Sequence, residues 1–242
     1  MSSLLPLVVL LTTAAVVVAF GVIMWRARTT ERDGWVAIVA TTVLTAWSII
    51  TTVLAYRGLF QPPTAKSFPP IGINLIVALF VLALSLTLSA SLRRLLSHQT
   101  NLIRLNVWRL LGMVFLILMA VGQMPALWAL PAGIGDVLVG ATAFWVARHV
   151  DTARGRRRAI IFNLLGMTDL IVAVFLGVTT NQGPAQLFHT TPTSALITHF
   201  PLALVPTFLV PLAFTIHVVS LWQLLGWKWV ISSIERRQTT RL

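Results

Sequence analysis

The sequence predicts an all-α integral membrane protein, built as a single bundle of seven transmembrane helices. Of its 242 residues, 57% are hydrophobic and only 10% are charged, whereas a soluble domain carries roughly 25% charged residues. The mean hydropathy is +0.88. Long apolar runs recur along the whole chain, so residues 1–242 are expected to form one transmembrane domain without a soluble module.

Seven apolar runs are long enough to cross a bilayer, which takes about 20 residues of helix. The first run has no basic residue before it and is followed by Arg26 and Arg28. We therefore expect it to be a retained helix and not a cleaved signal peptide. The predicted spans are 4–25, 35–56, 71–92, 105–124, 126–146, 159–180 and 202–226.

The basic residues predict the orientation of the bundle, because Lys and Arg accumulate in cytoplasmic loops. Sixteen of the 18 fall in alternate loops and the C-terminal tail, which leaves Arg57 and Lys66 on the other side. The N-terminus is thus predicted outside and the C-terminus inside. The single-domain layout and short loops favour a bacterial-type cytoplasmic (inner) membrane.

The same placement accounts for the formal net charge of +12 without nucleic acid, since basic loops lie against anionic headgroups. The lipid bilayer is therefore the expected partner. A weaker alternative is a docking surface for a soluble or membrane partner in the loop that carries Arg154, Arg156, Arg157 and Arg158.

Three ionisable residues are predicted to share one depth near the bilayer midplane. Asp136 precedes Arg148 by 12 residues, Asp169 follows Arg158 by 11, and His217 precedes Lys228 by 11. At 1.5 Å per residue each lies about 16 to 18 Å from the inner boundary. Small residues on the helix faces of Asp136 and Asp169 indicate that both carboxylates point into the bundle.

Burying two aspartates at this depth costs about 6 kcal/mol on insertion scales, so the cluster needs compensation by pairing, protonation, water or a ligand. One interpretation is purely structural: an Asp-to-His hydrogen bond and a neutral second Asp join three helices. We favour a functional site, because ionisable residues inside a membrane are mostly functional.

Other residues extend this picture along the helices. Gln123 toward the outside, with Asn163 and Arg109 toward the inside, would form a flanking polar path, although Arg109 is better explained as reaching the cytoplasmic headgroups. Helix breaks or hinges are expected at two places, the start of the fifth span and the proline-rich seventh span. The residues concerned are Pro131, Gly133, Gly135, Pro206 and Pro211. A short interfacial helix is expected over 194–200.

The residue types exclude several cofactors. Neither lysine, Lys66 or Lys228, lies inside a span, so retinal has no attachment point, and His217 alone at depth does not make a bis-histidine haem site. The chain has no cysteine, which excludes thiolate metal sites. We predict no cofactor and no resident metal. A metal-dependent intramembrane hydrolase that uses Asp136, Asp169 and His217 ranks third, because catalytic zinc usually has more histidines.

The leading functional expectation is a small carrier or proton-coupled permease for an unknown small solute or proton, with its site between the fifth, sixth and seventh spans. Two nearby carboxylates cannot both ionise cheaply in a low dielectric, so one would take up and release a proton, with His217 as relay or counter-charge. The alternative is a non-catalytic membrane subunit or sensor that binds a ligand or a partner protein.

Overall fold

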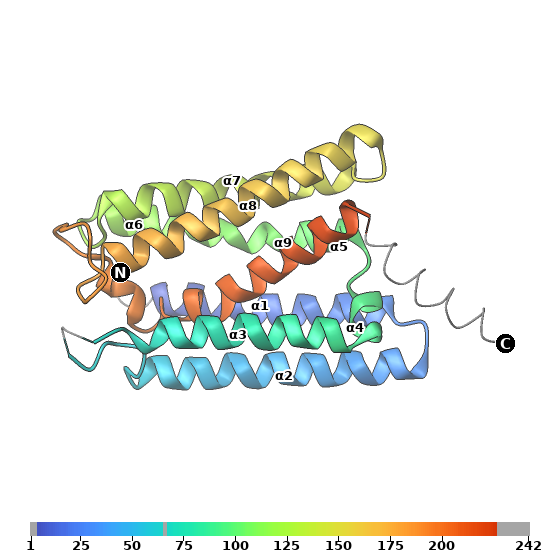
Figure 1. The fold of residues 1–242 in the computed structure, drawn as a ribbon, viewed down its shortest axis with the longest axis horizontal. Coiled ribbons are helices and arrows are strands. Elements are labelled where there is room, and N and C mark those ends of the chain that lie inside the picture. The colour runs from blue at the N-terminus through green and yellow to red at the C-terminus, as the bar shows by residue number, and fades with distance from the viewer. Residues whose placement is uncertain (1–3, 65–66, 227–242) are drawn as a thin grey trace.

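The computed structural model describes residues 4–64 and 67–226, and all regular secondary structure in these ranges is helical. The long helices lie roughly side by side in an elongated bundle (Figure 1). Seven helices of the described chain are long and apolar enough to span a membrane, which confirms the predicted number. They are Leu4–Ala27 (α1), Glu31–Tyr56 (α2), Pro70–Leu88 (α3), Gln99–Ala120, Ala126–Arg148 (α7), Ala153–Thr179 (α8) and Val205–Leu224.

Two of these spans are composite. The fourth consists of α5 (Gln99–Leu105), a tight 3-10 segment η1 (Asn106–Gly112) and α6 (Met113–Ala120). The seventh begins with a π-helical turn, η3 (Val205–Leu209), and continues as α9 (Val210–Leu224). The irregular seventh span was expected from its prolines, whereas nothing in the hydropathy pattern indicated η1.

The ends of the helices differ from the predicted ones by a few residues. The predicted third span divides at Ser89, whose hydroxyl oxygen accepts a hydrogen bond from Leu92 N at 3.1 Å and caps the short helix α4 (Ala90–Leu95). Helix α2 starts at Glu31, because Thr30 caps it by accepting from Asp33 N at 3.1 Å. This earlier start draws Asp33 into the helix, where its buried carboxylate pairs with Arg94 at 2.7 Å.

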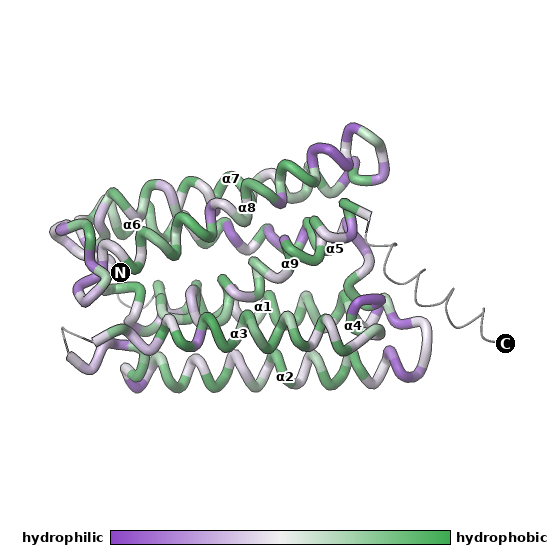
Figure 2. Tube along the Cα trace, viewed as in Figure 1, coloured by the Kyte–Doolittle hydropathy of each residue, from purple (hydrophilic) through white to green (hydrophobic). Residues whose placement is uncertain are grey.

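The two ends of the bundle differ in chemistry. The turns that join α1 to α2, α4 to α5 and α7 to α8 lie at one end (Figure 1), where hydrophilic residues gather (Figure 2). We call it the basic end, because its turns and the adjoining helix ends carry most of the described arginines predicted to be cytoplasmic. The opposite end, here the proline-rich end, holds the connections from α2 to α3 and from α8 to η3. The basic C-terminal tail and Lys66 lie outside the described residues.

Two expectations about helix breaks and loop helices need correction. Helix α7 is continuous from Ala126 to Arg148 through Pro131, Gly133 and Gly135, although Pro131 lies inside it and has no backbone N–H to donate. The expected interfacial helix is a single 3-10 turn, Ser194–Thr198 (η2). Ser194 and Thr198 are buried, so this turn packs into the bundle and does not lie on its outer surface.

The most buried spans are Gln99–Ala120 and Val205–Leu224, whereas α2 and α3 leave most of their surface uncovered. Helices α7 and α8 pack against these two buried spans. Polar groups on η1, α7, α8 and α9 therefore meet in the interior of the bundle.

Candidate functional site

The guanidinium of Arg109, on η1, lies at the centre of the buried polar groups. Its Nε donates to Asp136 Oδ1 at 2.6 Å, and its Nη2 donates to Asp169 Oδ2. Its Nη1 lies 3.1 Å from His217 Nε2 and donates to Gly166 O at 3.3 Å. We call Arg109, Asp136, Asp169 and His217 the Arg109 cluster. The three side chains predicted to share one depth thus meet on a single cation.

The interpretation of Arg109 as a residue that reaches the headgroups is wrong, because its side chain is fully buried. The span that carries it begins at Gln99, six residues before the predicted start. Arg109 therefore lies about 15 Å along the helix, near mid-depth, and not at its end. Arg109, and not His217, is the counter-charge of the two carboxylates.

Close helix packing brings η1 against α7. A Cβ on Gly140 would lie 2.7 Å from Leu110 N, and one on Gly133 would lie 3.0 Å from Gly112 O. Only glycine leaves room for backbones at these separations. The small residues that pointed to a buried face for Asp136 are thus the residues that let Arg109 approach it.

The hydrogen bonds around His217 fix its tautomer. Asn163 Nδ2 donates to Ala159 O at 2.8 Å, which leaves Asn163 Oδ1 to face His217 Nδ1 at 2.9 Å. An amide oxygen only accepts, so Nδ1 carries the proton. His217 Nε2 is then the acceptor for Arg109, which has only donors.

From His217 the hydrogen bonds continue toward the basic end. Asn163 Nδ2 donates to Ser220 Oγ at 2.8 Å, and Ser220 Oγ donates to Gln99 Oε1 at 2.7 Å. Gln99 Nε2 donates to Gln223 Oε1 at 2.7 Å, and Gln223 Nε2 donates to Leu96 O at 2.8 Å. We call Asn163, Ser220, Gln99 and Gln223 the amide chain. It connects the Arg109 cluster to the basic end.

The predicted flanking path is therefore present on one side only. Asn163 joins the cluster to the amide chain, whereas Gln123 is exposed in the turn between α6 and α7 and contacts none of the cluster. Sequence reasoning did not assign Gln99, Ser220 and Gln223 to this path. The available signal was the three-residue spacing from His217 to Ser220 and from Ser220 to Gln223, which makes successive side chains neighbours on one helix.

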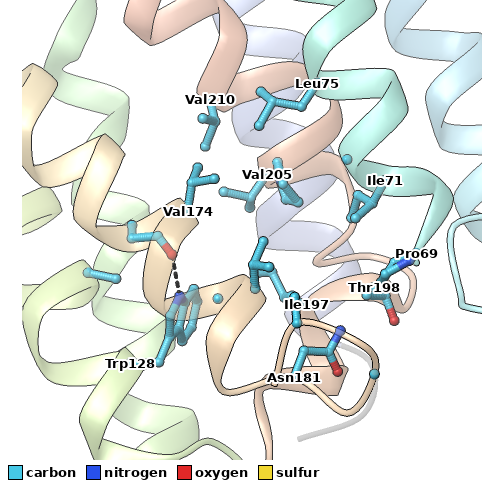
Figure 3. A pocket seen from close by; sticks show the side chains of 18 of the residues that line it. Pro69, Ile71, Leu75, Trp128, Val174, Asn181, Ile197, Thr198, Val205 and Val210 are labelled. Atoms are coloured by element: carbon cyan, nitrogen blue, oxygen red, sulfur yellow. Dashed lines mark hydrogen bonds between the residues drawn. The ribbon is translucent and has the colours of Figure 1, made fainter. Parts of the chain in front are cut away.

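A cavity of about 330 Å³ lies on the other side of the cluster, toward the proline-rich end. Among the described residues of its lining, Asp136 is the one ionisable residue, and the others are almost wholly apolar. Figure 3 shows side chains from α3, α7, α8 and the seventh span around it, among them Ile71, Leu75, Trp128, Val174, Val205 and Val210.

The carboxylate of Asp136, a lining residue, has one oxygen without a partner among the described residues. Its Oδ1 is held by Arg109, whereas its Oδ2 accepts no hydrogen bond from the described residues. Its side chain is 11% exposed.

Two aromatic residues share the lining with Asp136. Trp128 of α7 donates its indole N–H to Ala173 O at 2.8 Å and packs against Phe115, with 4.9 Å between ring centroids. Both aromatic residues line the cavity.

The arrangement does not suit the metal-dependent hydrolase. A guanidinium lies between Asp136, Asp169 and His217, where a shared metal ion would have to bind. Within residues 4–64 and 67–226, no group of three His, Cys, Asp or Glu side chains is placed to hold a metal ion.

No curated protein and no solved structure matches the chain. A family model with the description "Domain of unknown function (DUF8737)" matches residues 68–225. The match covers more than half of the chain and includes the Arg109 cluster, the amide chain and the cavity. The protein therefore belongs to the DUF8737 family.

Proposed function

We propose that the protein is a small membrane carrier, a proton-coupled permease, whose substrate site is the cavity that ends at Asp136. One observation carries the proposal: the cavity stops at a buried ion-pair cluster, from which hydrogen-bonded polar side chains lead on to the basic end. A central site that is reached from one end is the arrangement that alternating access requires.

The seventh span offers the moving part. Its π-helical turn, η3, contains Pro206, and α9 begins directly after it with Pro211 at its second residue. Val205 and Pro206 line the cavity, whereas His217 on α9 holds Arg109. A change in the turn would therefore alter the cavity and the cluster together.

The cluster supplies a reason for proton coupling. Two carboxylates face one guanidinium, so the group carries a net negative charge when both are ionised. In a low-dielectric interior a proton on one carboxylate would remove that charge. Coupling follows if the proton is held more tightly in one of the two open states.

We further propose that the basic end faces the cytoplasm of a bacterial-type cell, with the N-terminus outside. The support is the clustering of arginines in the turns and helix ends there, as the positive-inside rule requires. The cavity would then open toward the outer face.

A ligand-binding sensor or non-catalytic subunit is the second candidate. It is favoured by the Arg109 cluster itself, because the Nε, Nη1 and Nη2 atoms of Arg109 all contact acceptors within the chain. Such an arrangement also suits a purely structural role that holds the helices together. The loop with Arg154, Arg156, Arg157 and Arg158 gives this candidate less support. Arg156 Nε donates to Leu224 O at 2.9 Å, and the guanidinium of Arg158 lies 4.6 Å from the ring centroid of Trp145. Both side chains therefore already contact this chain and not a partner.

The test is a proteoliposome screen that measures solute uptake and proton flux. Val174→Trp fills the cavity, and Ile171→Trp is its control on the lipid-facing side of the same helix. We expect Val174→Trp and Asp136→Asn to abolish both signals, and Ile171→Trp to keep them. Ligand binding without uptake by the wild type would identify a sensor. Equal uptake by wild type and Val174→Trp would overturn the proposal.

A further inference from the structure

We infer that the cavity accepts a lipophilic monocation, an amine or quaternary ammonium with an apolar body, whose charged head lies against Asp136. The inference deepens the proposed carrier function by naming its substrate class. It rests on the charge balance of the Arg109 cluster, on the accessible face of that cluster, and on the form of the cavity.

The charge balance favours a single positive charge. Asp136 and Asp169 together carry two negative charges when ionised, and Arg109 supplies one positive charge. His217 is held as the neutral Nδ1–H tautomer by Asn163 and adds none. One further positive charge makes the cluster neutral, and a proton or a bound monocation can supply it.

The face that the cluster shows to the cavity is negative. Asp136 belongs to the lining, and its Oδ2 has no hydrogen-bond donor among the described residues, whereas Arg109 is fully buried and absent from the lining. An anion such as a fatty acid would meet the carboxylate and not the guanidinium. The geometry thus selects against anions and for cations.

The rest of the cavity suits an apolar body. On α8 the lining extends from Leu170 to Val178, about 12 Å along the helix. Phe115 and Trp128 add aromatic rings, which attract cations as well as apolar groups. A compact hydrated ion would leave this surface unused.

The cavity is also open to the side. Ile73 and Ile76 of α3 and Val178 of α8 belong to its lining, yet they are exposed on the surface that lipid would cover. An amphiphile dissolved in the bilayer can therefore reach Asp136 without leaving an apolar medium.

A proton and the cation would then exclude each other, because each neutralises the one excess negative charge of the Arg109 cluster. The exchange balances: a proton leaves one carboxylate as the cation binds, and a proton returns to that carboxylate as the cation leaves. No covalent bond other than O–H changes. Binding of the cation should release protons into the medium.

The experiment measures binding and proton release on the full chain in lipid nanodiscs, with decyltrimethylammonium as the probe. Decyl sulfate and 1-decanol are anionic and uncharged controls of equal chain length. Asp33→Asn is the matched control variant, because Asp33 is also a buried carboxylate in an ion pair but lies away from the cavity. Thermal melting of each variant verifies folding.

We expect the cation to bind the wild type and Asp33→Asn with proton release, and to bind Asp136→Asn about tenfold more weakly without release. Asp169→Asn should also weaken cation binding, although Asp169 is not in the lining. This substitution removes one negative charge from the Arg109 cluster and leaves the contact between the cation and Asp136 in place. Decanol binding should change in neither variant. These results support the inference.

Equal binding of the cation, the sulfate and the alcohol to the wild type would overturn the inference, and so would unchanged cation binding by a folded Asp136→Asn. The carrier proposal is tested separately by uptake. Cation binding without uptake would refute the carrier and keep the cation site, whereas uptake of uncharged solutes alone would keep the carrier and refute the cation site.

Discussion

His217 receives a hydrogen bond from Arg109 at Nε2, 3.1 Å away, because Asn163 holds the opposite ring nitrogen at 2.9 Å. The ring is therefore a fixed acceptor for the buried guanidinium. This relationship makes His217 a positioning residue for Arg109, and it leaves no lone pair on the ring for a further proton.

The first prediction concerns the tautomer of this ring. Solid-state NMR of protein labelled with ¹⁵N in histidine should show His217 with the proton on Nδ1, because the amide orientation of Asn163 is fixed by Ala159 O. His217→Ala identifies the resonance. In Asn163→Leu the proton should no longer be confined to Nδ1. A wild-type signal with the proton on Nε2 would contradict the hydrogen-bond pattern.

Removal of the central cation should destabilise the bundle. Arg109→Gln leaves two buried carboxylates without a counter-charge, and we expect a loss of about 3–5 kcal/mol in the free energy of unfolding. Denaturation in detergent, followed by circular dichroism, measures it. Arg94→Gln is the control and should cost less, because the Arg94 side chain is 51% exposed.

A second substitution should restore part of this loss. Adding Asp169→Asn to Arg109→Gln removes one of the unpaired charges, so the double variant should unfold at a higher denaturant concentration than Arg109→Gln alone. Additive destabilisation by the two substitutions would show that the two side chains do not interact as an ion pair.

The approach of η1 to α7 should depend on Gly140. A Cβ there would lie 2.7 Å from a backbone nitrogen, which cannot move aside as a side chain can. We expect Gly140→Ala to lower the free energy of unfolding by about 1–3 kcal/mol. Gly72→Ala, where no atom lies within 4 Å of the new Cβ, should be neutral or slightly stabilising. The same melting experiment compares the two.

The proposed orientation can be tested by single cysteines, because the chain has none of its own. Ala185→Cys lies at the proline-rich end and Arg154→Cys at the basic end. In intact cells an impermeant maleimide should label the first and reach the second only after lysis. The reverse pattern would invert the orientation, and with it the side from which the cavity opens.

Hydropathy was sufficient to predict the seven spans, because crossing an apolar layer sets a minimum length for each helix. Counting residues from basic boundaries also placed Asp136, Asp169 and His217 at one depth, and the structure brings all three to Arg109. This success depends on the regular rise of an α-helix, which fixes depth from sequence number.

Arg109 was misplaced for the same reason. Its span was counted from residue 105, where the apolar run begins, and the polar first turn from Gln99 was omitted. The missed signal is the number of charges, since a basic residue such as Arg109 on a neighbouring span is one of the partners that can compensate two buried aspartates. The cavity was beyond prediction, because apolar residues that line a cavity and those that face lipid have the same composition.

The direction of the hydrogen bonds along the amide chain has an energetic consequence for a cell. From Arg109 to Leu96 each donor points toward the basic end, and three of the four links are primary amides, which bind protons only weakly. For the proposed carrier, this half of the bundle should therefore conduct protons poorly. Proton leak through the molecule without bound substrate should be slow.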